Sequence, residues 1–153
     1  MVANAANVLL KEAFDALNLP FDLKDAPSRS VEDWQTIYAA AFGHYETGSF
    51  EEASQLFTQL ILADPYTEKH WRGLAASLQM EKKYEESLHA WAICALLAEN
   101  DPLVHFHAAE CLLSMKNKKE ALKALDVATE RLGKEESANA LRDKIELLKK
   151  LHV

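Results

Sequence analysis

Apolar residues recur every three or four positions along most of the chain, the spacing that places them on one face of an α-helix. Such stripes predict an N-terminal helix over residues 5–18 and a last helix over about 135–151. Between them the pattern predicts helices at about 31–47, 50–63, 68–81, 84–98, a helix opening at 102, and 118–131. Helix-breaking residues stand at the expected breaks, namely Pro20, Gly48, Pro65 and Gly133.

The helical pattern repeats with a period of 34 residues. The pair Ala53 and Phe57 is followed at this spacing by Ser87 and Trp91 and then by Ala121 and Leu125; Ile37, Trp71 and His105 are spaced likewise. A period of 34 with a Trp-x2-Leu-Gly-x2-Tyr…Ala-x3-Phe…Pro skeleton is the signature of the tetratricopeptide repeat, a helix–turn–helix unit. The sequence therefore predicts an all-α superhelix of three tandem repeats.

The repeats divide the chain into three parts. Residues 1–29 form an N-terminal amphipathic helix and a linker that holds two prolines. Residues 30–133 hold the repeats, at 34–67, 68–101 and 102–133. Residues 134–153 form a capping helix whose apolar stripe is expected to cover the open end of the stack, as the solubility of repeat proteins requires.

Short polar residues precede several of the predicted helices and predict how those helices begin. Ser30 with Asp33 resembles a capping box, Ser49 with Glu52 completes one, and Asn117 is placed to cap the helix at 118–131. Lys83 stands at the equivalent position of the second repeat and cannot cap in this way. Gly133 is expected to end the helix before it in the usual C-terminal role.

Composition narrows the classes of function. The net charge is −7 and there is no long basic run, which argues against a nucleic-acid partner. No apolar run approaches the roughly 18–20 residues of a membrane span, and the N-terminus lacks the positive region of a signal peptide. Cys94 and Cys111 have no metal-ligand spacing and are expected to be reduced core thiols. We therefore expect a cytoplasmic protein that does not insert into membranes.

No arrangement of residues predicts catalysis, a metal or a cofactor. His105 and His107 resemble a metal pair, but side chains two apart on a helix do not face each other. They are expected to be ordinary core or surface histidines. Phosphate-binding glycine loops, nucleophile elbows and zinc-protease motifs are absent from the sequence. The sequence therefore favours a binding protein over an enzyme.

The first helix of each repeat is expected to line the concave side of the stack. Positions 2, 5, 9 and 12 of each unit point into this groove, and they are Gln35, Tyr38, Phe42 and Tyr45 in the first unit, Lys69, Arg72, Ala76 and Gln79 in the second, and Leu103, Phe106, Glu110 and Leu113 in the third. Three aromatics followed by polar and small residues suit an extended peptide with spaced hydrophobic anchors. Alternatively, Tyr38, Phe42 and Tyr45 pack against the N-terminal helix.

Over about residues 30–133 the chain resembles the class II chaperones of type III secretion systems, which protect translocator proteins. The resemblance is carried by Ile37-Tyr38…Phe42…Tyr45…Gly48…Phe50-Glu51…Ala53 and by Phe106-His-Ala-Ala-Glu-Cys-Leu-Leu113. It implies a chaperone of the bacterial cytosol that holds the extended N-terminal segment of a hydrophobic translocator in its concave groove before export.

The resemblance also implies roles for individual residues. Tyr38, Phe42 and Tyr45 would line the pockets for the client's anchors. Phe50 and Trp91 match aromatics of the family, and for them a core role is equally open. Members of the family often dimerise, several through the N-terminal helix, and we expect a weak homodimer that uses Leu10, Phe14 and Leu17.

Two other functions stay open at this stage. One is a generic tetratricopeptide-repeat scaffold or regulatory adaptor that joins two folded proteins through its convex face or its N-terminal helix. The other is an enzyme subunit or a metal protein. A change in the groove would leave an adaptor unaffected, and a metal analysis would reveal the third class.

Overall fold

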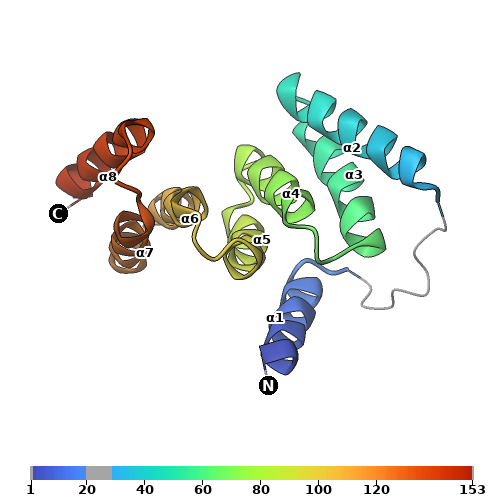
Figure 1. The fold of residues 1–153 in the computed structure, drawn as a ribbon, viewed down its shortest axis with the longest axis horizontal. Coiled ribbons are helices and arrows are strands. Elements are labelled where there is room, and N and C mark those ends of the chain that lie inside the picture. Colours follow the sequence, from blue (N-terminus) through green and yellow to red (C-terminus); the bar gives the residue numbers. More distant parts are fainter. Residues whose placement is uncertain (1, 20–28, 153) are drawn as a thin grey trace.

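The computed structural model describes residues 2–19 and 29–152, and over these it is all-helical (Figure 1). The helices are α1 (Val2–Ala16), α2 (Val31–Glu46), α3 (Phe50–Ala63), α4 (Glu68–Met80), α5 (Tyr84–Leu97), α6 (Pro102–Ser114), α7 (Lys118–Arg131) and α8 (Asn139–His152), with a short 3-10 helix, η2 (Glu136–Ala138), before α8. The all-α prediction is confirmed. Most of the predicted linker, residues 20–28, lies outside the described residues.

Three antiparallel helix pairs, α2–α3, α4–α5 and α6–α7, follow one another along the molecule (Figure 1). The first helices of the pairs, α2, α4 and α6, succeed one another along one side, and α8 continues this row at the C-terminal end. The N-terminal helix α1 lies on the other side, against α5. None of the helices within the described ranges has the length and apolar character needed to cross a bilayer.

The 34-residue period corresponds to the close contacts between helices. Ala41, Ala75 and Ala109 are completely buried, and so are Ala53, Ser87 and Ala121 at the facing positions. Small side chains at these points let neighbouring helices approach closely, and larger residues such as Phe57, Trp71 and Leu125 fill the space between. The periodic core expected from the sequence is therefore present in the structure.

The helix ends differ from the predictions at Ser49. The Ser30 capping box is present, with both bonds at 3.2 Å, and Asn117 Oδ1 accepts from the Glu120 N–H at 3.4 Å. Ser49 makes no side-chain cap, so the predicted capping box is wrong. Its backbone N–H donates to the His44 carbonyl instead, in a tight turn whose φ of −85° and ψ of 68° depart from the extended cap geometry.

The C-terminal helix and Gly133 also differ from expectation. Gly133 is not among the described residues with positive φ, so it does not end α7 as a left-handed glycine. Its carbonyl instead accepts a 2.7 Å hydrogen bond from Arg142 of α8. The final α-helix begins at Asn139 rather than near 135, because Glu135 has extended backbone and η2 intervenes.

Candidate functional site

A pocket of about 220 Å³ opens between α2 and α4 on the side that the first helices line. Most of the residues that line it are aromatic or small, and a few are polar or charged. The lining residues are Tyr38, Phe42, Tyr45, Phe57, Lys69, Arg72, Gly73, Ala76, Trp91 and His107. We call this the first pocket.

Aromatic side chains of α2 form one wall of the first pocket. Tyr38 stacks on Phe42 with ring centroids 6.4 Å apart, because residues four apart lie one above the other on a helix. The Tyr38 and Phe57 rings pack edge to face with centroids 6.0 Å apart. The Lys69 ammonium lies over the Tyr38 ring, 4.5 Å from its centroid. These contacts tie the wall to α3 and α4, whereas α1 packs against α5 and the Trp71 ring. Packing of the three groove aromatics against the N-terminal helix is therefore not what the structure shows.

Gly73 of α4 gives the first pocket its floor. A Cβ atom at this position would overlap the ring of Phe57, which packs directly on the glycine backbone. Phe57 is itself almost completely buried, at 1% exposed, so its ring is held against the glycine. The absence of a side chain at Gly73 therefore leaves space that the Phe57 ring occupies, and from there the ring lines the pocket.

Arg72 connects the first pocket to the start of α6. Its guanidinium donates to Glu68 and to Asp101, both at 2.6 Å, and Asp101 is also the N-cap of α6. Burial lowers the pKa of Arg72, but the hydrogen bonds to Asp101 and Glu68 outweigh burial and leave that pKa raised. The Arg72 guanidinium therefore stays protonated and is held in the pocket wall by two carboxylates.

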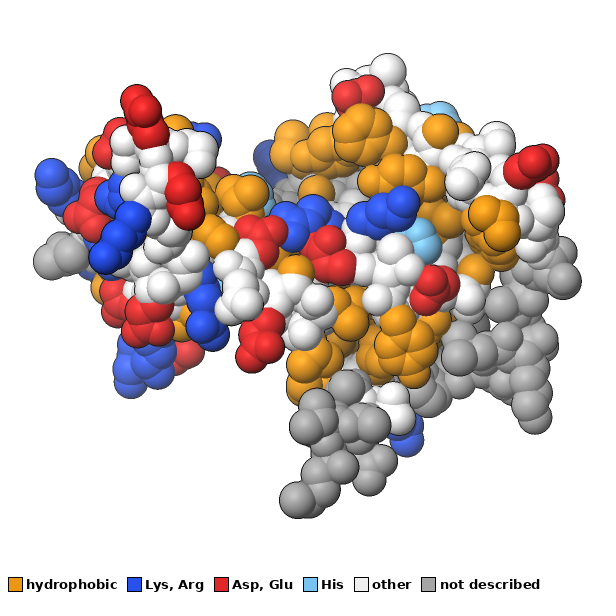
Figure 2. All heavy atoms as spheres, in the orientation of Figure 1, with side chains coloured by type: hydrophobic (Ala, Val, Ile, Leu, Met, Phe, Trp, Pro, Cys, Tyr) orange, Lys and Arg blue, Asp and Glu red, His pale blue; other side chains and the backbone are white. Residues whose placement is uncertain are grey.

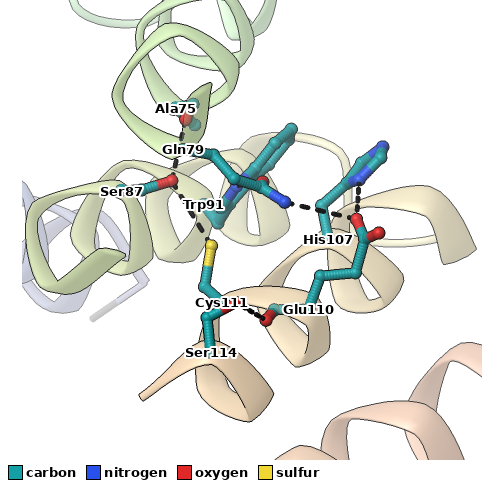
Figure 3. A network of polar contacts seen from close by, with 8 residues as sticks. All are labelled: Ala75, Gln79, Ser87, Trp91, His107, Glu110, Cys111 and Ser114. Carbon is teal, nitrogen blue, oxygen red and sulfur yellow. Dashed lines mark hydrogen bonds and ion pairs between the residues drawn. The ribbon is translucent and has the colours of Figure 1, made fainter. Parts of the chain in front are cut away.

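A polar network joins α4, α5 and α6 beside the first pocket (Figure 3). Trp91 Nε1 donates to Gln79 at 3.1 Å, and the Gln79 amide donates to Glu110 Oε1 at 3.3 Å. His107 Nδ1 donates to the same carboxylate oxygen at 2.7 Å, and its ring stacks on Trp91 with centroids 4.9 Å apart. Burial raises the pKa of Glu110, but His107 and Gln79 together lower it below its ordinary value.

The cysteines lie in the core below this network. Cys111 Sγ lies 3.6 Å from Ser87 Oγ, which donates to the Ala75 carbonyl. Burial raises the pKa of Cys111 to about 11, and it raises the pKa of Cys94 well above its ordinary value. Both thiols are free and buried, which agrees with the core role expected of them.

A second pocket, of about 480 Å³, lies between α6 and the C-terminal helix. Phe106 and Leu103 of α6 contribute to it, and so do Leu141 and Lys144 of α8. His107 lines both this pocket and the first one.

Most of the predicted groove residues fall into three groups. Six of them come together in the first pocket: Tyr38, Phe42, Tyr45, Lys69, Arg72 and Ala76. Gln79 and Glu110 form the polar network beside it, and Phe106 lies in the second pocket. Phe50 lines neither pocket, but its ring packs edge-on against Tyr45 at 5.5 Å and supports that wall.

Sequence reasoning did not assign Phe57, Gly73 or His107 to the groove, and it left Trp91 open. Gly73 and His107 are 34 residues apart, so both occupy position 6 of their repeat. The period could have identified this further groove position. Phe57 and Trp91 are also 34 apart, but they occupy a core position, and only the glycine opposite Phe57 lets its ring reach the pocket.

The residues predicted for a dimer interface lie within the chain's own core. Leu10 and Phe14 are 3% and 1% exposed, and the Phe14 ring meets Trp71 edge-on at 5.9 Å. Leu17 is partly buried against the same core. Because α1 buries these side chains against its own chain, a second copy of the protein cannot contact Leu10 or Phe14 unless α1 is displaced. The exposed large apolar residues of α1 whose side chains are described are Val8 and Leu9.

Within the described ranges, no group of three or more His, Cys, Asp or Glu is arranged to hold a metal ion. His107 is held by Glu110, whereas burial lowers the pKa of His105. The two histidines therefore have separate surroundings.

The chain is similar in sequence and in structure to several known proteins. No family model matches the chain. It is 33% identical over 101 residues to low calcium response locus protein H of Yersinia pestis, a match that covers 66% of this chain and 60% of the relative's length. The Yersinia enterocolitica type III secretion chaperone SycD, solved with a peptide of the translocator YopD, is 28% identical with a TM-score of 0.76, over 80% of this chain and 93% of SycD.

Two further solved structures extend this likeness. SycD has also been solved as an alternative dimer, with 28% identity, a TM-score of 0.75, and coverage of 80% of this chain and 92% of SycD. PcrH of Pseudomonas aeruginosa, in complex with the chaperone-binding region of PopD, is 27% identical with a TM-score of 0.76, over 81% of this chain and 93% of PcrH.

The fold and the first pocket define an all-α repeat protein of the tetratricopeptide type with an aromatic groove. More particularly, the homologues and structural neighbours of this chain are type III secretion class II translocator chaperones, and the chain shares their fold.

Proposed function

We propose that the protein is a chaperone of the bacterial cytosol that binds a hydrophobic translocator of a type III secretion system before export. The observation that carries this proposal is the first pocket, where three aromatics of α2 line a cavity whose floor is the Phe57 ring packed on Gly73. Two homologues with the same fold are known in complex with translocator segments, which supports a client of this class.

The geometry suits an extended N-terminal segment of the client with an apolar anchor. Phe42 is 46% exposed, so an anchor side chain entering the pocket removes an open aromatic surface from water together with its own. Full burial of one such anchor contributes about 1.5–3 kcal/mol. Lys69 and Arg72 present donors beside the pocket, where backbone carbonyls of an extended chain need partners. The protein acts by stoichiometric masking and performs no chemical turnover.

A weak homodimer is a separate part of the proposal. The alternative dimer of SycD supports it. Because Leu10 and Phe14 are buried within the chain, a dimer through α1 uses the exposed edge at Val8 and Leu9 or requires α1 to leave its place.

The test of the proposed function is co-expression with translocators encoded in the same genome. We expect a soluble one-to-one complex with at least one of them, because the groove masks the segment that otherwise aggregates. Tyr38→Ala combined with Tyr45→Ala is expected to weaken that complex by about 2 kcal/mol or more, the loss typical of central anchor sites. The matched control is Tyr66→Ala, since Tyr66 is 58% exposed and lies outside both pockets.

A loss below about 0.5 kcal/mol in the double variant would contradict the assignment of the groove. If the double variant still binds a partner with full affinity, the protein acts as an adaptor through another face.

A further inference from the structure

A third pocket, of about 850 Å³, lies on the side of the molecule where α1 packs against α5. It is bounded by the C-terminal end of α1, the first turns of α5 and the turn between α6 and α7, and Leu17, Tyr84 and Met115 give it an apolar wall. Met115 is 41% exposed, so this wall is open to water. The third pocket shares no lining residue with the first or the second, and it therefore lies apart from the groove.

The charged side chains at the rim of the third pocket are only partly neutralised by the chain itself. Glu85 and Glu86 line it, and within residues 2–19 and 29–152 neither has an ion pair. Lys83 is bound to Glu81 at 3.2 Å, whereas Lys82 is exposed and has no carboxylate partner among the described residues. A surface that fits this rim therefore brings a cation for the glutamates and an anion for Lys82, on either side of an apolar group.

The outer face of α8 has this combination of side chains. Ile145 turns inward and is buried, whereas Leu147 and Leu151 are 56% and 66% exposed and, being four apart, lie one above the other. Glu146 and Lys150 are exposed beside them, and neither takes part in an ion pair in the part of the chain that is described. In Figure 2, side chains of both charges gather on the α7–α8 end of the molecule. This face of α8 thus has an uncovered apolar pair framed by both charges.

We propose that the outer face of α8 docks in the third pocket of a second copy of this chain. Leu147 and Leu151 meet its apolar wall, Lys150 meets Glu85, and Glu146 meets Lys82. The occupant is a second copy because the two surfaces match in apolar content and in the sign of their charges. When each copy inserts its α8 into the other, the contact closes a dimer.

This inference rests on the homodimer of the proposed function and names a contact for it. The contact leaves α1 in the core of its own chain, where its buried side chains already lie. It also leaves the first pocket free, because the two pockets have no residue in common. Dimerisation and client binding can therefore be measured separately.

Sedimentation equilibrium of the full chain, from micromolar to millimolar concentration, tests the apolar part of the contact. We expect a reversible dimer whose dissociation constant rises about tenfold or more in Leu147→Ser, because each dimer loses two buried leucines. Urea denaturation should show an unchanged fold, since Leu147 is exposed in the single chain. The matched control is Leu96→Ser, at a 38% exposed position of α5 outside the third pocket, where the dissociation constant is retained.

Exchanging charges tests which surfaces meet. Glu85→Lys and Lys150→Glu are each expected to weaken the dimer about tenfold, because each places like charges together at both contacts. An equimolar mixture of the two variants should restore it. In the mixed dimer one contact pairs the original Lys150 with the original Glu85, and the other pairs the two reversed side chains. Glu130→Lys, at an exposed position of α7, replaces Glu85→Lys in the control mixture and should restore nothing.

The remaining outcomes overturn the inference. A chain that stays monomeric over the whole concentration range has no such contact. If Leu147→Ser leaves the dimer intact while Val8→Ser combined with Leu9→Ser dissociates it, the copies meet at the edge of α1 instead. An assembly that grows past two chains overturns the reciprocal contact. None of these results touches the proposed function, which fails only if co-expression yields no complex with a translocator.

Discussion

At the scale of single residues, position 6 of the repeat shapes the groove. Gly73 holds this position in the second repeat and leaves space that the Phe57 ring occupies, whereas His107 holds it in the third and forms the wall between the two pockets. Helix propensity disfavours glycine within α4, so its presence there is explained by this contact rather than by local structure. The same sequence position thus serves as floor in one repeat and as partition in the next.

Gly73→Ala tests this role. The new methyl must displace the Phe57 ring, and we expect a net loss of about 1–2 kcal/mol in the free energy of unfolding, together with weaker client binding. Gly43→Ala is the matched control, because nothing lies within 4 Å of a Cβ at Gly43 of α2. There we expect a gain of up to about 1 kcal/mol from helix propensity. Urea denaturation measures both, and a gain in stability at Gly73 would contradict the packing described.

Glu110 makes the network between the pockets sensitive to acid. Its pKa is lowered in the folded protein, so the carboxylate contributes stability above its ordinary pKa of 4.5, and that contribution is lost as the pH falls through the lowered value. Glu110→Gln is expected to lower stability at pH 7 by about 0.5–1 kcal/mol. The difference from the unmodified protein should shrink as the pH falls below 4.5.

Urea denaturation as a function of pH measures this difference. Glu130→Gln, an exposed position on α7, is the control and should show no comparable dependence. If the difference in the free energy of unfolding between Glu110→Gln and the unmodified protein instead grows toward low pH, the Glu110 carboxylate does not stabilise the fold in the way described.

At the scale of elements, the turns inside the three repeats share one backbone geometry. Gly48, Lys82 and Lys116, each 34 residues apart, have φ of 85°, 64° and 62°, the left-handed region that closes a helix before a tight turn. Only the first is a glycine. Periodicity predicted the helices and their ends to within a few residues, but it could not predict that two lysines would adopt a conformation that glycine favours.

Lys116→Gly is therefore expected to stabilise the protein by about 1 kcal/mol, because it relieves the steric cost of a left-handed side chain. The matched control is Lys119→Gly, the same change three residues later within α7, where glycine is expected to cost up to about 1 kcal/mol. Thermal and urea denaturation measure the gain in stability expected for Lys116→Gly and the loss expected for Lys119→Gly. Equal losses in the two variants would contradict the assigned turn conformation.

At the scale of the whole molecule, the position of α1 changes the interpretation of its apolar stripe. The sequence shows that Leu10 and Phe14 must be covered, but a stripe of this kind fits an intramolecular core and a dimer interface equally well. In the structure α1 closes the side of the stack opposite the groove, and the Phe14 ring contacts Trp71 of α4 there. The groove is left uncovered by α1.

Phe14→Ala is expected to reduce the free energy of unfolding by about 3–5 kcal/mol, the cost of removing a buried phenyl ring. If the ring is covered by its own chain, Phe14→Ala will keep the mass of the unmodified protein, and the loss of stability will be the same at every protein concentration. Val8→Ala, at a 55% exposed position of the same helix, should change stability by less than about 0.5 kcal/mol. A midpoint that rises with concentration, with a lower mass for the Phe14 variant, would instead place the ring in a dimer interface.

The sequence by itself determined the repeat, because a 34-residue period of small and large apolar residues can be satisfied only by stacked helix pairs. It also put Tyr38, Phe42 and Tyr45 on one face of a helix, since helical spacing fixes which side chains share a face, but it left open whether that face lines the groove or meets the N-terminal helix. The tertiary structure decided the rest. The meeting of Phe57 with Gly73, the shared wall at His107 and the place of α1 all depend on how helices far apart in the chain pack, which periodicity within one helix does not specify.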